Sequence, residues 1–321
     1  MASSALVAAV GVIGHISDGA LWRPASRPVS EQLARLGATA ARQDVWEACY
    51  PGLKEPDRVG QFCNVFKSDP SADLAVGVFG DSHAEFILPA FEKVGDEAVV
   101  WHSSLGGCPP LEGVYVVAGN YDTDVCREMA REQLRFAMEK RLDVVVLVGR
   151  WSLYTHRSIH DEQSRYLLTT SRIGGVASIE DSRRAFETLL DRTLANYRKA
   201  GIAVILVEQI PQQNLDPKLA IERMAFFGVA GDASRFVAET SVLITEDRER
   251  MRFSDAALRR RVQDGVSLLS FDDLFAQGDR YHWAMRGDSW YFDHNHLSPV
   301  GARQLQDRVY EAVMAARKPR G

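Results

Sequence analysis

The sequence predicts an α/β fold built on a parallel β-sheet. Short, continuous apolar runs such as 74–79 and 143–148 have the length and composition of strands that are buried on both faces. Longer segments with helical spacing follow these runs, and this alternation is typical of helices packed on both faces of a parallel sheet. With 321 residues, of which 46% are hydrophobic, the chain can bury a large core in one or two domains.

Each element can be placed from its pattern. Strands are expected at 74–79, 97–102, 143–148, 202–207 and 266–271, which gives a sheet of about five strands. Helices are expected near 29–41, 83–94, 123–141, 180–200, 236–262 and 299–316. The stretch 152–178 reads as irregular and polar, and 211–235 reads as an insertion. We find no repeat, so one α/β domain with an N-terminal extension is expected.

The charge of the chain argues against nucleic acid as a partner. The formal net charge is −5, whereas a nucleic-acid binder usually carries a basic stripe. The strongest basic run, 259–261, lies within a helical pattern and is read as a solvated helix face.

Residues 5–14 form a short apolar run near the N-terminus. The run is shorter than the roughly 20 residues that span a bilayer. No Lys or Arg precedes it, so it lacks the charged front of a secretory signal. The sequence leaves three interpretations open: a weak signal or anchor, the end of a membrane helix, or an ordinary N-terminal helix.

The four cysteines fall into two local pairs, Cys49 with Cys63 and Cys108 with Cys126. Their loop-like surroundings suit two short disulfide loops in an oxidising compartment, although four reduced thiols remain the alternative. The spacings do not fit a zinc or redox site of the Cys-x-x-Cys type.

Ser82 is the candidate nucleophile. It follows the apolar run 74–79 in the sequence Gly80-Asp81-Ser82 and precedes a helical pattern. It should therefore lie at a helix N-terminus at the carboxyl end of a strand, where open α/β sheets bind ligands. The alternative is that Ser82 only caps the helix.

The candidate base and its partner lie more than two hundred residues later, at His296 and Asp293. A spacing of three at the start of a helix lets the Asp hold one imidazole nitrogen while the other faces a serine, which is the logic of a Ser-His-Asp triad. The alternatives are a surface histidine and a turn aspartate. His294 and His296 also have the spacing of a metal pair, but no third ligand is apparent, so no metal is expected.

A second Gly-Asp-Ser occurs at 287–289, where no apolar strand precedes it. We expect this copy to be a turn in front of the Asp293 segment. The tripeptide alone is therefore a weak signal, and its context favours Ser82.

Gly80-Asp81-Ser82 and the segment 293–298 together resemble the SGNH/GDSL hydrolase superfamily, and Cys108-Pro109-Pro110-Leu111 adds to a closer match with one branch of it. The resemblance is narrower to the extracytoplasmic SGNH domains of acyltransferase-3 (AT3) proteins, which O-acylate bacterial surface glycans. It implies a three-layer flavodoxin-like fold. It also implies a membrane-helix stub or weak signal/anchor at 1–22, an extension at 23–70 that packs on the domain, and a catalytic domain at 71–321.

The resemblance also implies oxyanion donors. Gly106 or Gly107 corresponds in order to the family's block II glycine, and Ser82 can offer its own amide. After the third strand the wider superfamily has Gly-x-Asn-Asp, whereas this chain has Gly149-Arg150-Trp151-Ser152 and lacks the Asn. Arg150 is then a candidate charged donor, and Trp151 is a candidate substrate contact.

Aromatic residues flank the expected site loops: Trp151, Tyr154, Trp283, Trp290 and Tyr291. Such side chains can stack on sugar rings, although core packing is their commoner role.

The predicted function is serine-dependent O-acyl transfer, most simply of acetyl, to a bacterial surface polysaccharide, without metal or cofactor. The expected partners are an acceptor glycan, an acyl donor and an AT3 membrane domain, at the periplasmic face of the inner membrane. Two alternatives stay open, a stand-alone carbohydrate or lipid acetylesterase and a non-catalytic glycan-binding module.

Overall fold

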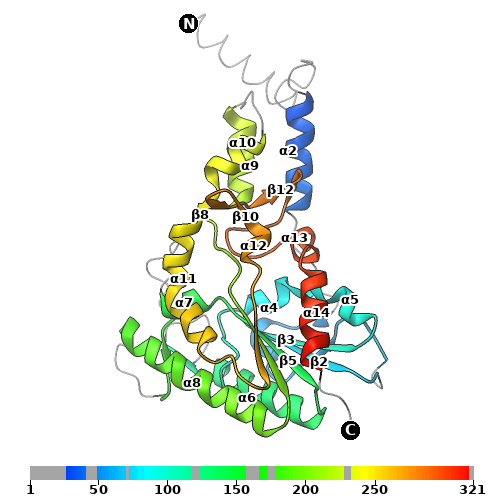
Figure 1. Cartoon of the computed structure of the whole chain (residues 1–321), viewed down its shortest axis with the longest axis vertical. Coiled ribbons are helices and arrows are strands. Elements are labelled where there is room, and N and C mark those ends of the chain that lie inside the picture. Colours follow the sequence, from blue (N-terminus) through cyan, green and yellow to red (C-terminus); the bar gives the residue numbers. More distant parts are fainter. Residues whose placement is uncertain are drawn as a thin grey trace, which may run out of the picture.

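The computed structural model describes residues 27–40, 49–69, 72–117, 123–156, 166–172, 178–227 and 233–317. A six-stranded sheet lies in the lower half of the view in Figure 1, with helices on both of its faces. The expected α/β architecture with a mostly parallel sheet is confirmed. The expected segment 1–22 lies outside the described residues.

The strand order of the central sheet is β1-β3-β2-β5-β7-β9. Five of these strands run parallel to one another, and their bounds are β3 (Val99–Ser104), β2 (Ala75–Gly80), β5 (Val144–Val148), β7 (Ala203–Val207) and β9 (Val266–Leu269). The sixth, β1 (Cys63–Asn64), pairs antiparallel with β3 at the edge. This two-residue strand was not predicted, because it is too short to show a period.

The central strands alternate their side chains between two hydrophobic cores. In β2, Val76 and Val78 belong to one core, whereas Phe79 belongs to the other. The first core is covered by α4 (Ser82–Phe86), η2 (Leu88–Phe91), α5 (Glu92–Gly95), α13 (Pro299–Arg303) and α14 (Gln306–Ala316). The second is covered by α6 (Thr123–Glu139), α7 (Trp151–Thr155), α8 (Ile179–Lys199) and α11 (Ile244–Arg259). The three-layer arrangement follows from this alternation.

The upper part of the molecule in Figure 1 is built from segments outside the sheet. It contains α2 (Arg27–Thr39), α9 (Pro217–Phe227), α10 (Ala233–Thr240) and a hairpin of β12 (Ala284–Met285) and β13 (Asp288–Ser289). A small sheet joins β10 (Ala276–Gln277), β11 (Arg280–Tyr281) and β8 (Val242–Leu243). The remaining short elements are η1 (Glu55–Arg58), β4 (Tyr115–Val116), β6 (Leu168–Thr169) and α12 (Asp272–Phe275).

Several predicted helices are interrupted, and the expectations for two other stretches need correction. The helix expected at 83–94 breaks into α4, η2 and α5, because Pro89 lies early in η2 and cannot donate a backbone hydrogen bond. The helix expected at 236–262 is split by β8, and that expected at 299–316 is split between α13 and α14. The stretch 152–178 contains most of α7 and all of β6, and 211–235 contains α9.

Both expected disulfides are present, Cys49–Cys63 and Cys108–Cys126. The first closes a loop that carries Tyr50 and Arg58 onto the back of the nucleophile helix. Tyr50 donates to the carbonyl of His102 at 3.1 Å, and the Arg58 guanidinium lies over the Tyr50 ring. Arg58 also approaches Glu85 of α4, and both of these side chains are buried. The extension is therefore joined to the α/β core.

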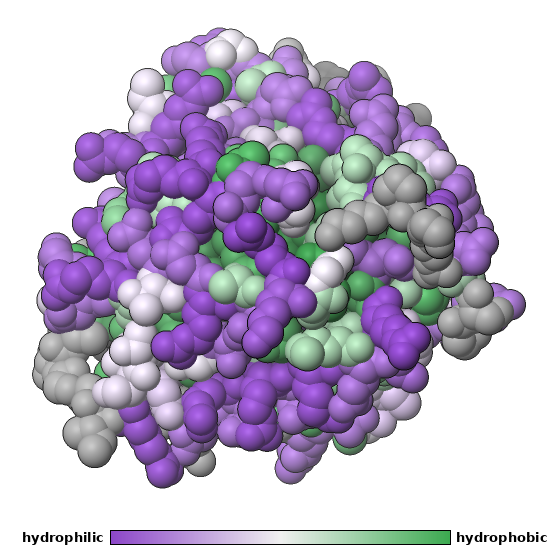
Figure 2. Space-filling model, turned by 60° about the horizontal axis from the view of Figure 1, so that its bottom comes forward, coloured by the Kyte–Doolittle hydropathy of each residue, from purple (hydrophilic) through white to green (hydrophobic). Residues whose placement is uncertain are grey.

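The end of the molecule that faces the viewer in Figure 2 is mainly hydrophilic around a smaller hydrophobic centre. Among the described residues, the large hydrophobic side chains that are clearly exposed are Val117, Met138, Leu219 and Val262, which come from separate elements. In the described part of the chain, no helix is long and apolar enough to cross a membrane.

His102 makes the stability of the fold depend on pH. It is fully buried, its Nδ1 lies 3.1 Å from the carbonyl of Val78, and its Nε2 lies 3.0 Å from the Ser104 hydroxyl. Burial lowers the pKa of His102 to about 3. Between pH 6.5 and pH 3 the unfolded chain therefore binds a proton that the folded chain does not, and stability falls as the pH falls.

We expect the free energy of unfolding to fall by about 2 kcal/mol more between pH 7 and pH 5 in the wild type than in His102→Gln. Urea unfolding at both pH values measures this difference. Because His102→Gln also loses packing, the comparison concerns the change with pH and not the stability at one pH. Equal changes in the two proteins would contradict the role of His102.

Candidate active site

The turn that carries Ser82 depends on a close approach between β2 and β5. A side chain at Gly80 would place its Cβ 1.9 Å from the carbonyl oxygen of Val148, so only glycine fits at the end of β2. Asp81 then caps α4 by accepting from the amide of His83 at 2.9 Å. Ser82 is the first residue of α4, at the carboxyl end of the strand, as the sequence predicted.

His296 and Asp293 lie in the segment between the β12–β13 hairpin and α13. The Ser82 hydroxyl lies 2.7 Å from His296 Nε2, and His296 Nδ1 lies 2.7 Å from Asp293 Oδ2. Asp293 Oδ1 also accepts from the amides of Asn295 and His296, at 2.8 Å each. The three predicted residues therefore form one continuous chain of hydrogen bonds.

The electrostatics of this chain favour an ionised Asp293. Burial alone would raise its pKa, but the hydrogen bond to His296, the His296 charge and the two backbone amides lower the pKa well below its usual range. A carboxylate at this position accepts the proton on Nδ1 and leaves Nε2 to accept from Ser82. Phe86 stacks on the His296 ring with 4.3 Å between the ring centres, which restricts the orientation of the imidazole.

Asp81 joins several segments of the site by hydrogen bonds, a role that was not predicted from the sequence. Its Oδ2 accepts from the amide of Arg150 and from the hydroxyl of Tyr154, both at 2.8 Å. The side chain is buried, and burial would raise its pKa, but His83 and the two backbone amides lower the pKa overall. One carboxylate thus joins the nucleophile turn to the segment after β5. The position of Asp81 inside the Gly80-Asp81-Ser82 motif is the one sequence signal that could have indicated this role.

His83 lies beside the triad. Its ring is 4.8 Å from that of His296, and its Nδ1 lies 3.4 Å from Asp81 Oδ1. The side chain is buried, and this burial lowers its pKa and favours the neutral imidazole. His83 therefore contributes packing next to the triad.

Arg150 brings a partly buried positive charge to the same edge of the sheet. Its Nε donates to Gln212 at 3.3 Å, and one terminal nitrogen lies 3.5 Å from His294 Nε2. Burial lowers the pKa of Arg150, whereas the charges of Asp293 and Asp81 raise it. The guanidinium thus lies against the segment that carries the triad residues His296 and Asp293. No pattern in the sequence indicates these contacts of Gln212 and His294, because both depend on tertiary packing.

The expectation that Trp151 contacts substrate needs correction. Its side chain is fully buried, and its indole nitrogen donates to the carbonyl of Val207 at 2.7 Å. The other aromatic residues considered as sugar platforms are also buried, with Trp290 the most exposed at 8%: Tyr154, Trp283, Trp290 and Tyr291. Their size makes them core residues, so stacking on a sugar in the catalytic site is not supported for this set.

Gly106 and Gly107 form the turn directly after β3. In the register of the sheet Gly80 lies opposite Ser104, so Ser82 and Gly106 each follow the strand end by two residues. Gly107 has a φ of 73°, and a Cβ there would lie 2.7 Å from the Tyr166 ring. The turn follows the strand that neighbours β2, and the choice of oxyanion donor between the two glycines stays a prediction.

The His294-x-His296 spacing does not form a metal site with its neighbours. Among the described residues, no group of three or more His, Cys, Asp or Glu side chains is arranged to hold a metal ion. His294 Nε2 instead lies 3.0 Å from the side-chain amide of Asn295.

The Asp81 contacts predict a graded loss of stability. Asp81→Ala leaves two buried amides and one hydroxyl without their acceptor, and we expect it to cost at least about 3 kcal/mol, because each buried donor without a partner costs about 1–3 kcal/mol. Tyr154→Phe removes only one donor and should cost about 1 kcal/mol. Asp81→Asn should fall between the two. Chemical unfolding measures the order, and equal losses for Asp81→Ala and Tyr154→Phe would contradict it.

The sequence matches a family described as "SGNH domain (fused to AT3 domains)" over residues 48–311. No match is found among curated proteins. Among solved structures, the chain is similar to the periplasmic domain of a lipopolysaccharide acetyltransferase from Salmonella ser. Paratyphi A. The sequences are 13% identical, the TM-score is 0.56, and the alignment covers 86% of this chain and 99% of that one.

More distant similarity is found to two further structures. An acetyl xylan esterase is 16% identical, with a TM-score of 0.42 and coverage of 75% of this chain and 100% of that one. A GDSL-like lipase from Bacteroides thetaiotaomicron is 11% identical, with a TM-score of 0.40 and coverage of 75% and 88%.

The identities are low, so the similarity to solved structures concerns the fold. The family match supports acyl transfer or ester hydrolysis in general. Because the match spans residues 48–311 of 321, this chain belongs to the family of SGNH domains described as fused to AT3 domains.

Proposed function

We propose that this protein transfers an acyl group, most simply acetyl, to a hydroxyl of a bacterial surface polysaccharide through an acyl-serine intermediate. The observation that carries the proposal is the unbroken chain of hydrogen bonds from Ser82 through His296 to Asp293. A serine, a histidine and an acid in these relative positions are the parts of a nucleophilic triad. Family membership supports the same class of chemistry.

In the first half-reaction His296 Nε2 takes the proton of the Ser82 hydroxyl as Oγ attacks the acyl carbonyl carbon. The tetrahedral intermediate collapses, the bond to the donor oxygen breaks, and that oxygen leaves with the proton from His296. In the second half-reaction an acceptor hydroxyl gives its proton to His296 and attacks the acyl-serine, and Ser82 regains the proton. Asp293 holds the tautomer and stabilises the imidazolium in both halves.

The oxyanion of each tetrahedral intermediate needs hydrogen-bond donors that are fixed before the reaction. We assign this role to the Ser82 amide and to the backbone of the Gly106-Gly107 turn, which follows the neighbouring strand. The partly buried Arg150 adds positive charge at the same edge. The absence of the superfamily Asn, which is an oxyanion donor, suits a site that passes its acyl group to a sugar and limits the reaction with water.

The acceptor we propose is a surface glycan outside the cytoplasm, and the acyl donor would be presented by an AT3 membrane domain. The family description, in which SGNH domains are fused to AT3 domains, supports this partner. The two disulfides suit an oxidising extracytoplasmic compartment, at the periplasmic face of the inner membrane. We propose no metal or cofactor for this chemistry.

If the triad is catalytic, substitutions in it should reduce the esterase activity of the protein on an aryl acetate. We expect Ser82→Ala to abolish a burst of acyl-enzyme, and Asp293→Asn to lower kcat by about 10²- to 10⁴-fold, because it favours the wrong tautomer of His296. Stopped-flow release of the aryl alcohol measures both. Asp307→Asn, an exposed carboxylate on α14, is the matched control. Release that does not depend on Ser82 would reject the proposed function.

An acceptor then separates transfer from hydrolysis. When surface polysaccharide is added, a transferase should form acylated glycan at the expense of free acetate, which mass spectrometry of the glycan detects. Formation of free acetate alone would favour the acetylesterase, and the absence of any Ser82-dependent product would favour a binding module.

Arg150 gives a separate prediction about the oxyanion. We expect Arg150→Ala to lower kcat on the aryl acetate by about 100-fold with a smaller change in KM, because the loss of an oxyanion-stabilising group acts on the transition state. Arg303→Ala serves as the control. It removes a half-exposed arginine at the end of α13, whose partner is Glu92 of α5. An unchanged kcat in Arg150→Ala would remove Arg150 from the catalytic machinery.

A further inference from the structure

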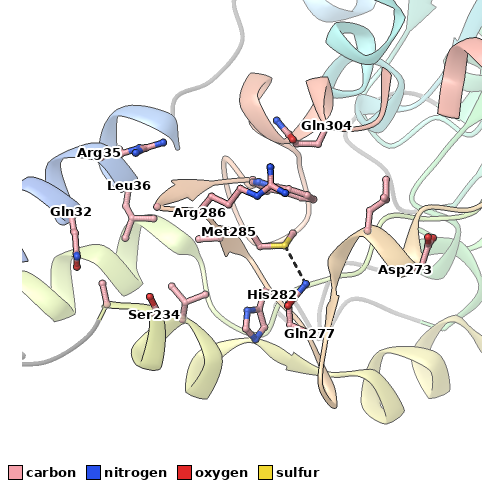
Figure 3. Close-up of a pocket in the computed structure, with 16 residues that line it drawn as sticks. Gln32, Arg35, Leu36, Ser234, Asp273, Gln277, His282, Met285, Arg286 and Gln304 are labelled. Carbon is pink, nitrogen blue, oxygen red and sulfur yellow. Dashed lines mark hydrogen bonds between the residues drawn. The ribbon is translucent and has the colours of Figure 1, made fainter. Parts of the chain in front are cut away.

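A cavity of about 900 Å³ lies apart from the triad, between α2, α10, α13 and the β12–β13 hairpin. Its volume is in the range of sites that bind small molecules. In Figure 3 the labelled side chains surround one space, with Gln32, Arg35 and Leu36 on α2 and Arg286 on the hairpin. No triad residue lines it. The cavity is therefore a candidate binding site distinct from the catalytic centre.

The lining combines amide side chains with an aromatic and a thioether. Gln32, Gln277 and Gln304 come from three separate parts of the chain. Gln277 donates to the Met285 sulfur (Figure 3) and Gln304 donates to the carbonyl of Val300, but each amide has a second N–H and an acceptor oxygen. Trp290 and Met285 add apolar surface to the same cavity. Amides that can pair with vicinal hydroxyls, together with an apolar surface for the ring C–H groups, make a lining that suits a saccharide.

Arg286 has an unusual backbone for its residue type. Met285 pairs with Asp288 in the hairpin, so Arg286 and Gly287 form its two-residue turn, with φ values of 55° and 84°. Turns of this kind prefer Asn or Gly at the first position, because other residues are strained at positive φ. A strained residue whose side chain lines a cavity points to a function for that side chain.

The other charged groups of the lining are paired, whereas Arg286 is an exposed cation. Arg35 is held by Asp288, with Nε–Oδ1 and Nη2–Oδ2 distances of 2.7 and 2.8 Å. Asp273 is bound by Arg308. Within the described part of the chain, Arg286 forms no ion pair, and its side chain lies at the cavity (Figure 3). A ligand that carries a carboxylate or phosphate can accept two hydrogen bonds from this guanidinium.

The cavity also touches the back of the segment that carries the triad. Trp290 lies three residues before Asp293, and its carbonyl accepts from the amide of Ser298 at 2.9 Å. A Cβ at Gly301 would lie 2.1 Å from the same carbonyl oxygen, so α13 packs directly against Trp290. A ligand held by this cavity would thus lie on the same structural unit as His296.

We propose that this cavity binds an acidic oligosaccharide segment of the acceptor, with Arg286 pairing to its carboxylate or phosphate. The inference rests on the proposed function, in which the acceptor is a glycan. It adds that this glycan is acidic and that it binds at a second site, outside the catalytic centre. Saccharide hydroxyls bind the glutamine amides, and the sugar rings contact the apolar surface at Met285.

Calorimetry on the Ser82→Ala protein tests binding without turnover. The probes are tetragalacturonic acid and its methyl ester, which share one backbone but differ in charge. We expect the acid to bind at least 10-fold more tightly than the ester, and Arg286→Gly to weaken binding of the acid by about 10- to 100-fold. Equal binding of acid and ester, or unchanged binding of the acid in Arg286→Gly, would overturn the proposal.

Arg141→Gly is the matched control, because Arg141 is an exposed arginine with a φ of 52° that does not line the cavity. Both glycine variants should raise Tm by about 1–3 °C as strain is relieved, but only Arg286→Gly should lose affinity. Equal loss in both variants would overturn the proposal. The release of aryl alcohol by the wild-type enzyme, compared with Ser82→Ala, tests the proposed function separately, so that either proposal can fail alone.

Discussion

The buried carboxylate of Asp81 is the interaction on which the catalytic edge depends. It can accept from His83, Arg150 and Tyr154 because β2 and β5 approach closely where Gly80 lacks a side chain. A buried carboxylate without these donors would be costly, and the donors without it would be unsatisfied. The turn that presents Ser82 and the segment that presents Arg150 are thereby held as one unit, before any substrate binds.

The segment that carries Asp293 and His296 is held against the Ser82 turn by contacts between residues far apart in the sequence. Ser298 caps α13 and also donates to the carbonyl of Ser289, and Gly301 lets α13 lie against Trp290. These contacts fix the segment 293–298 on the hairpin side, while Phe86 and Ser82 fix His296 on the sheet side. Preorganisation of this kind is what a triad needs, because a small displacement of the base lowers the rate strongly.

Those features of the fold and site that depend on local sequence pattern could be predicted. Apolar runs placed five parallel strands, and the two motifs placed Ser82, Asp293 and His296. It was insufficient where tertiary contacts decide. The edge strand Cys63–Asn64 exists because it pairs with β3, Trp151 faces the core because α7 turns it inward, and Asp81 acts through residues about seventy positions away. None of these partners leaves a periodic signal in the chain.

The arginines at 150 and 286 show two ways in which a cation can be held. Arg150 is partly buried beside Asp81 and Asp293, and its charge is stabilised by the anions that organise the triad. Arg286 stands at a strained turn, where neither burial nor an ion pair among the described residues accounts for it. A cation with fixed partners stabilises charge that develops during a reaction, because it does not need to reorganise. Arg141 has a similar backbone conformation away from the cavity, so strain alone does not indicate a ligand; Arg286 differs because its side chain lines the cavity, where a ligand can reach it.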